Sequence, residues 1–152
     1  MTKLPESRRL APPLPGEVIR YAYLWMHEAA EGREEARKDR PCAVVIATTD
    51  VAGVPSVVVV PITSRAPSSP DEGMEIPVAT RRRMGLQDEP CWAVLTEVNR
   101  FVWPGPDLRP VTTVLGANWG YGPLPATLFE RLRDAIVARA RSRTLRVTSR
   151  SA

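Results

Sequence analysis

The chain has 152 residues, a length typical of one domain, and its 21 Lys and Arg against 17 Asp and Glu give a formal net charge of +4. Its hydrophobic share of 43% is enough for a core and excludes global disorder, and no apolar run approaches the roughly 20 residues that span a bilayer. The first residues lack the apolar stretch of a secretory signal, so we expect a cytoplasmic protein. Cys42 and Cys91 lie in apolar stretches, which predicts buried free thiols rather than a disulfide.

The positive charge is concentrated at the C-terminal end of the chain. Residues 131–152 carry seven Arg and one Asp, whereas residues 1–130 carry 14 basic and 16 acidic side chains. A basic balance suggests a nucleic-acid partner. Solvation or contacts between protein chains explain this particular distribution equally well.

The first half of the chain predicts an arm followed by strands. Residues 1–15 hold four prolines and few large apolar groups, which indicates an extended Pro-rich arm. We expect a strand over 17–25 and then a mobile charged loop over 27–40, because the loop lacks an apolar stripe. Residues 41–47 and 56–62 are nearly continuous apolar runs, typical of strands covered on both faces. The turn residues between these two runs predict an antiparallel hairpin.

Shorter elements are predicted in the second half. In chain order we expect a surface loop over 64–73, an edge strand over 74–76, a helix over 77–84, a buried strand over 91–98 continued by 101–103, and a loop over 104–125. Gly85 is expected to end the first helix, whose Arg81, Arg82 and Arg83 form a solvated face or contact phosphate.

An amphipathic helix is predicted near the C-terminus. Apolar residues recur four apart over 125–140, and Thr127 and Glu130 fit a capping box. Residues 144–152 are expected to form a basic tail. The whole order predicts one domain over 16–143, mainly β with a C-terminal α-helix, in which a small curled sheet or partial barrel packs on the helix.

Few of the usual catalytic groups are present in the sequence. The chain has one His, its two Cys lack zinc spacing, and it contains no phosphate-binding loop of the Walker or dinucleotide type. Arg40 precedes one strand of the predicted hairpin and Thr63 follows the other, so both fall at its open end. A guanidinium offers a fork to phosphate oxygens, and a Thr hydroxyl can bond a phosphate or ribose oxygen. A surface ion pair for Arg40 and a turn role for Thr63 are the alternatives.

Several segments, in their order along the chain, resemble the MazF/PemK (Kid) toxins of type II toxin–antitoxin systems. These segments are Gly16-Glu17-Val18, Gly32-Arg33-Glu34-Glu35, the strand from Arg40-Pro41 to Ile46, Val60-Pro61-Ile62-Thr63-Ser64, Gly85-Leu86, and the stretch from Trp92 to Arg100. The similarity covers roughly residues 16–103. It implies an SH3-like β-barrel of the PemK/MazF/CcdB type, usually a homodimer, that cleaves single-stranded RNA without a metal or cofactor and has a cognate antitoxin as protein partner.

The resemblance also implies roles for single residues. Arg40 and Thr63 match the catalytic pair, and the 2′-hydroxyl of the ribose attacks its own phosphate to leave a cyclic phosphate and a 5′-hydroxyl. Arg40 would stabilise the developing charge and protonate the leaving oxygen, and Thr63 would orient the phosphate. The residues expected to bind RNA are Arg37, Lys38, Ser64, Glu34 and Arg100.

Some readings stay open at this point. The segment before Arg40 departs from the family pattern, with Glu35 where Gln is expected, so an inactive binding module on the same barrel is the alternative function. Glu97 and Arg100 form a structural ion pair or contact RNA. Trp92 and Trp103 are expected to be core aromatics, with stacking on RNA bases as the alternative.

Overall fold

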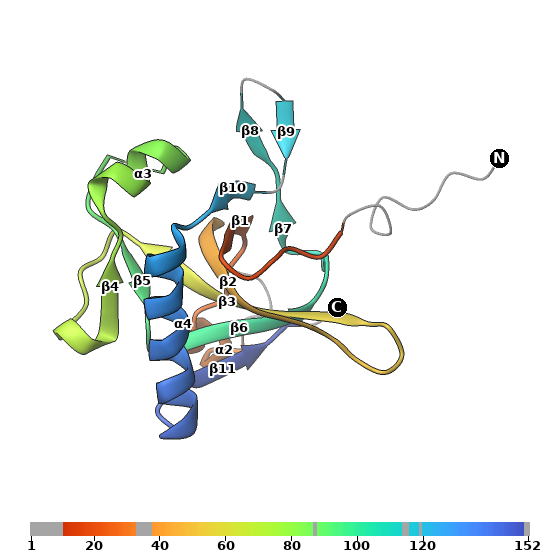
Figure 1. Ribbon diagram of the computed structural model, residues 1–152. Helices are drawn as coiled ribbons and strands as arrows, with labels where there is room; N and C mark the ends of the chain where they lie inside the picture. Colours follow the sequence, from red (N-terminus) through yellow and green to blue (C-terminus); the bar gives the residue numbers. More distant parts are fainter. Residues whose placement is uncertain (1–10, 33–37, 87, 114–115, 119, 151–152) are drawn as a thin grey trace.

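A mainly antiparallel β-sheet with a C-terminal helix is the architecture of the chain (Figure 1). The computed structural model describes residues 11–32, 38–86, 88–113, 116–118 and 120–150. Their elements are β1 (Glu17–Tyr21), α2 (Met26–Ala30), β2 (Arg40–Thr49), β3 (Pro55–Thr63), η1 (Pro70–Glu72), β4 (Gly73–Glu75), α3 (Val78–Met84), β5 (Trp92–Val94), β6 (Glu97–Val102), β7 (Leu108–Arg109), β8 (Val111–Thr113), β9 (Gly116–Asn118), β10 (Gly120–Pro123), α4 (Ala126–Arg141) and β11 (Arg146–Ser149). The predicted fold class is confirmed.

The β2–β3 hairpin forms the centre of the main sheet. The predicted antiparallel pairing is confirmed, with Cys42 opposite Pro61 at one end and Thr49 opposite Pro55 at the other. Gly53 occupies the turn with a φ of +83°, a conformation that favours glycine. Alternate side chains of β2 point to opposite faces, and both faces are buried, as the continuous apolar run predicted.

Two apolar clusters cover the two faces of the sheet. On one face, Leu128, Leu132 and Ile136 of α4 pack on residues of β2 and β3, in the helix predicted from the apolar spacing. On the other face, the rings of Tyr21 and Phe101 stack with their centres 4.4 Å apart. Since β2 and β3 separate the strands of these two rings, the sheet must be strongly curled. Its end strands, β10 and β4, do not pair, so the predicted barrel stays open.

The strand predicted over 91–98 is divided into two, which changes the edge of the sheet. Residues Ser56–Val59 of β3 pair with β6, whereas Ile62 and Thr63 pair with β5. Between β5 and β6 the chain turns at Leu95, whose N–H donates to the carbonyl of Glu72 at 2.9 Å. The predicted edge strand near 74–76 is present as β4, which pairs with β5.

Within the basic tail predicted over 144–152, residues Arg146–Ser149 form strand β11. β11 pairs in parallel with β6, and Arg150 after it is buried. The Nη2 of Arg150 lies 3.0 Å from Oδ2 of Asp107, and its Nη1 donates to the carbonyl of Ala22 at 2.7 Å. Charged side chains that looked like a solvated tail therefore include one that anchors the C-terminal strand to the core.

Other predictions for the loops need correction. Part of the loop expected over 104–125 forms the short strands β7 to β10, which Gly and Pro residues concealed. The charged loop expected over 27–40 begins with helix α2, in which Glu28 is buried. Pro125 is the N-cap of α4 and no side chain caps it, so the capping box predicted at Thr127 and Glu130 was wrong.

Helix α3 fits its prediction except for one Arg. It ends at Gly85, which adopts the left-handed conformation with a φ of 73°. Arg81, expected on a solvated face, is buried and donates from Nη1 to the carbonyl of Ile76 at 3.2 Å and from Nη2 to that of Asp88 at 3.2 Å. Among the described residues, no helix is long and apolar enough to cross a membrane.

The Arg150 anchor yields a stability prediction. We expect Arg150→Ala to lower the free energy of unfolding by about 3 kcal/mol, because it leaves the carboxylate of Asp107 without this buried partner. Urea unfolding measures this loss. The matched control is Arg146→Ala, an exposed Arg on β11, which should change stability by less than about 0.5 kcal/mol. Equal losses in the two variants would contradict the anchor.

Candidate functional site

Arg40 and Thr63 lie together at the open end of the β2–β3 hairpin, where the hairpin geometry predicted them. Arg40 begins β2 and Thr63 ends β3. Both side chains line a hollow of about 650 Å³, and both also border a neighbouring hollow of about 280 Å³. A group bound between Arg40 and Thr63 would therefore have space on two sides.

The guanidinium of Arg40 rests on an aromatic ring. Its Cζ lies 4.9 Å from the centre of the Trp25 ring, a distance typical of a cation–π contact. Its Nε is buried and has no hydrogen-bond partner within the described part of the chain. A buried N–H without a partner is rare, and Nε of Arg81 and the hydroxyl of Tyr21, which line neither hollow, share this state. Arg40 is thus oriented by Trp25 while it retains a free donor.

Trp25 is itself enclosed by neighbours. Its ring meets the edge of Tyr23 with centres 5.1 Å apart and stacks on His27 at 6.5 Å, and its backbone N–H donates to Oε1 of Glu28 at 3.1 Å. Sequence analysis did not identify Trp25 as a site residue. The only signal was its place, just after the first strand and before the charged segment that precedes Arg40.

Strand β6 holds the segment that carries Trp25. The buried side chain of Asn99 accepts from the N–H of Leu24 at 2.9 Å and donates to the carbonyl of the same residue at 2.8 Å. Oε1 of Glu97 accepts from the N–H of Met26 at 2.9 Å and from the hydroxyl of Tyr23 at 3.0 Å. Two side chains of one strand therefore fix the backbone on both sides of Trp25.

Thr63 lines both hollows and carries a hydroxyl with one hydrogen-bond partner in the described chain. Its Oγ1 accepts from the backbone N–H of Arg65 at 3.2 Å, which leaves the hydroxyl hydrogen available to a ligand. In the pairing of β3 with β5, Thr63 lies opposite Trp92, and Trp92 also lines the larger hollow. Trp92 is half-buried, so its prediction as a core aromatic was wrong, whereas Trp103 is buried as expected.

The other predicted RNA-binding residues are only partly brought together. Lys38 and Ser64 line both hollows beside Arg40. Arg100 lies apart from them, in a separate hollow of about 270 Å³ that also contains Thr49 and Asp50, at the other end of β2. Glu34 and Arg37 lie outside the described residues.

Of the two interpretations offered for Glu97 and Arg100, the structural ion pair is not found among the described residues. Because positions 97 and 100 alternate across β6, Glu97 faces Tyr23 and Met26, and it forms no ion pair with Arg100. Asp39, next to Arg40, pairs instead with Nε of Arg20. The carboxylate of Asp39 is thus paired with Arg20 rather than with its neighbour Arg40.

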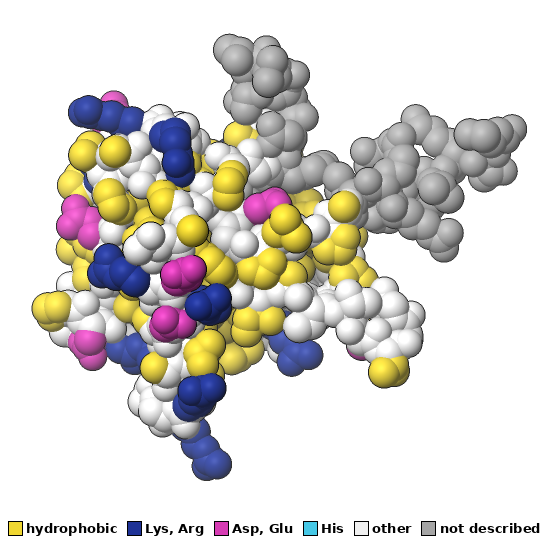
Figure 2. Space-filling model, in the orientation of Figure 1, with side chains coloured by type: hydrophobic (Ala, Val, Ile, Leu, Met, Phe, Trp, Pro, Cys, Tyr) yellow, Lys and Arg dark blue, Asp and Glu magenta, His cyan; other side chains and the backbone are white. Residues whose placement is uncertain are grey.

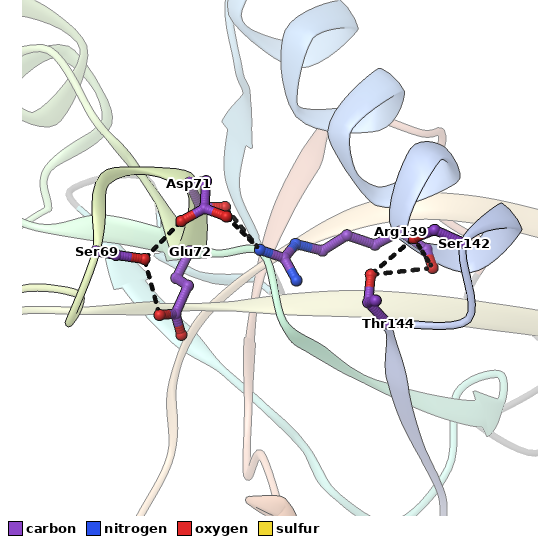
Figure 3. A network of polar contacts seen from close by, with 6 residues as sticks. All are labelled: Ser69, Asp71, Glu72, Arg139, Ser142 and Thr144. Carbon is purple, nitrogen blue, oxygen red and sulfur yellow. Dashed lines mark hydrogen bonds and ion pairs between the residues drawn. The ribbon is translucent and has the colours of Figure 1, made fainter.

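The wall of the larger hollow opposite β2 is tied to the C-terminal helix (Figure 3). Nη2 of Arg139 in α4 donates to the carbonyl of Asp71 at 2.9 Å, and Oγ of Ser69 donates to Oε1 of Glu72 at 2.9 Å. Glu72 lines the hollow. The loop predicted over 64–73 is therefore an organised wall of the site, held through η1.

The described residues contain no group of three or more His, Cys, Asp or Glu placed to hold a metal ion. The two Cys are free and buried, as predicted. Burial raises the pKa of the Cys42 thiol and also that of Cys91, which borders the smaller hollow. Neither thiol therefore has the lowered pKa of a reactive cysteine.

The fold and the site together define a class of protein. A mainly antiparallel sheet with a C-terminal helix, and with Arg-Pro and Pro-Ile-Thr segments at the open end of the central hairpin, is consistent with the PemK/MazF fold. A family model described as "PemK-like, MazF-like toxin of type II toxin-antitoxin system" matches residues 21–101. The match covers more than half of the chain, and the chain belongs to this family. None of the curated proteins with which the chain was compared matches it.

Glu97 provides a pH test of the support beneath the site. Burial raises its pKa above the ordinary value, although hydrogen bonds from Met26 and Tyr23 oppose the rise. A carboxyl whose pKa is higher in the folded state favours folding while it is protonated. The protein therefore loses this stability as the pH rises from below the unfolded pKa, near 4.3, through the folded pKa. In Glu97→Gln the amide oxygen can accept the same bonds without a charge. We therefore expect this variant to lose less stability between about pH 4 and pH 7 than the unmodified protein.

Thermal unfolding at a series of pH values measures the difference. Glu75→Gln is the control, because Glu75 is exposed on β4. The expectation fails if the curve of the Glu97 variant runs parallel to that of the unmodified protein over this range.

Proposed function

We propose that the protein is an endoribonuclease toxin that cleaves single-stranded RNA at Arg40 and Thr63 without a metal ion. The observation that carries this proposal is the shared hollow in which the guanidinium of Arg40, with its buried and unpartnered Nε, lies beside the Thr63 hydroxyl. Membership of the toxin family supports the same conclusion. It also supports an antitoxin as protein partner, a homodimer as the assembly and the cytoplasm as the place of action.

A phosphodiester between Arg40 and Thr63 suits the chemistry of both groups. In the proposed reaction the ribose 2′-oxygen forms a bond to phosphorus and the bond to the 5′-oxygen breaks. The 2′-hydroxyl loses its proton and the leaving oxygen gains one, which gives a cyclic phosphate and a 5′-hydroxyl. Negative charge grows on the non-bridging oxygens as phosphorus becomes five-coordinate, so donors aimed at these oxygens lower the barrier.

The two residues would divide this work. Arg40 would donate from its guanidinium to the developing charge, with Trp25 holding the planar group at one angle. The Thr63 hydroxyl, whose oxygen already accepts from the N–H of Arg65, would donate its hydrogen to a phosphate oxygen. Lys38 and Ser64 border the same space and would position the strand on either side.

Arg40→Ala and Thr63→Ala test the assignment. A long single-stranded RNA is incubated with each variant in EDTA, and the new 5′-hydroxyl ends are detected by enzymatic phosphorylation. Loss of one charge-stabilising donor typically lowers the rate by about 100- to 1000-fold, and we expect a loss of that order for Arg40→Ala. Arg40→Lys should recover only part of it, since an ammonium has neither the planar fork nor the stacking geometry.

Arg82→Ala is the matched control, because Arg82 is exposed on α3 and lines neither hollow. Equal cleavage by all the variants would show that neither Arg40 nor Thr63 contributes to catalysis. If the unmodified protein neither cleaves RNA nor slows growth on overexpression, the chain is instead a binding module on the same fold.

The salt dependence of binding gives a separate test. Three cations, Lys38, Arg40 and Arg65, line the larger hollow, whereas basic and acidic side chains are interspersed on the face that α4 covers (Figure 2). For three phosphate contacts on a single strand, the slope of log K against log salt is roughly −2. Anisotropy with a 2′-O-methyl oligonucleotide measures it. A slope of about −5 or steeper would instead indicate more phosphate contacts, including contacts from the Arg residues of the C-terminal end.

A further inference from the structure

We propose that Trp92 is the base-stacking platform of the larger hollow, on which the base next to the cleaved phosphate lies. The inference rests on the proposed function, because it takes the site at Arg40 and Thr63 as the position of the phosphate. It adds a residue that recognises RNA through the flat face of a base, separate from the residues that hold the phosphate.

The position of Trp92 is the first argument. It begins β5 and lies directly opposite Thr63 in the antiparallel pairing of β3 with β5. Directly opposed residues in such a pair have their Cβ atoms about 4.5–5.5 Å apart and share one face of the sheet. Trp92, Thr63 and Arg40 also line the same hollow. A phosphate held by Thr63 would therefore place its own nucleoside beside the indole.

The state of the indole is the second argument. Trp25 is engaged by Arg40, Tyr23 and His27, and Trp103 is buried and packs near Phe101 at 6.2 Å. Trp92 is half-buried and, among the described residues, its ring contacts no other aromatic ring and no guanidinium. A large apolar ring that opens into a charged hollow without such a partner is more simply explained by a ligand than by packing.

The size of the hollow is the third argument. Its volume of about 650 Å³ falls within the range of about 300–1000 Å³ that is typical of small-molecule sites. The neighbouring hollow, about 280 Å³, is also lined by Arg40 and Thr63 and contains Leu86 and Tyr121 instead of Trp92. A nucleotide base with its ribose therefore fits the Trp92 side more easily than the other side.

The test compares Trp92→Leu, Trp92→Phe and Val94→Ala. Val94 lines the same hollow two residues along β5 and carries no ring, so its variant controls for a general disturbance of the wall. Cleavage is first mapped on a long RNA. A short RNA with the mapped site is then used intact and with an abasic nucleotide on one or the other side of the cleaved phosphate. Circular dichroism and thermal unfolding confirm that each variant is folded.

Stacking of one base is worth about 1–3 kcal/mol, so we expect Trp92→Leu to raise KM by about 5- to 150-fold. Trp92→Phe should recover most of this loss, whereas any change in KM caused by Val94→Ala should be the same with the intact and the abasic substrates. For the unmodified protein, one of the two abasic substrates should have a KM higher than the intact substrate by a similar factor. For Trp92→Leu, the same abasic substrate should raise KM little further. A KM for Trp92→Leu within twofold of the unmodified value, or fully additive effects of variant and abasic substrate, would overturn the proposal.

A binding measurement separates this proposal from the proposed function. If the unmodified protein does not cleave RNA, the endoribonuclease assignment fails, and a mixed-sequence 2′-O-methyl oligonucleotide then tests Trp92 alone. Tighter binding to the unmodified protein than to Trp92→Leu, with stronger quenching of tryptophan fluorescence in the former, would support the platform. Equal affinities, or no binding to either protein, would overturn it.

Discussion

The hydrogen bonds from β6 to the segment after β1 are the constraint on which the site depends. Asn99 satisfies both backbone groups of Leu24, and Glu97 accepts from Met26, so Trp25 between them has little freedom to move. Trp25 in turn supports Arg40 through a cation–π contact. Asn99 is fully buried, and a buried amide without its partners would cost about 1–3 kcal/mol. The fold therefore stabilises the geometry of the site through the same bonds that satisfy its own core.

The meaning of the net charge changes once the basic residues are placed in the fold. Arg150 is buried against Asp107, Arg139 holds the η1 turn through Asp71, and Arg133 pairs with Asp134 on the surface of α4 at 3.4 Å. Much of the C-terminal excess of Arg thus serves internal contacts. In the proposed function an anionic ligand instead meets Arg40, in a part of the chain with a small net negative charge. Local geometry rather than total charge identifies the site.

Features that depend on neighbours in the sequence could be predicted. The continuous apolar runs of β2 and β3, the glycine that ends α3 and the apolar spacing of α4 all act locally, and each predicted its element. Arg40 and Thr63 were found because a hairpin has only one open end. The family resemblance led to the same pair.

Features that depend on distant partners could not be predicted. β11 is held by its pairing with β6 and by the ion pair between Arg150 and Asp107, and no pattern within residues 144–152 predicts these distant contacts. Strands β9 and β10 contain Gly or Pro residues that usually indicate a loop, and Pro110 separates β7 from β8. Arg100 was expected at the site from its place in a motif, yet the length of β2 separates it from Arg40.

The division between β5 and β6 explains why the hollow is where it is. β3 pairs with β6 along its first half and with β5 at its end, so the sheet branches as it approaches Thr63. The two branches diverge around Leu95 and Thr96, and the hollow lies between them: Trp92, Val94 and Thr96 line it from one branch, and Tyr23 and Trp25, held by β6, line it from the other. The site therefore lies at this backbone branch: strands β2, β3 and β5 carry Arg40, Thr63 and Trp92, and the loop over 64–68 completes its wall.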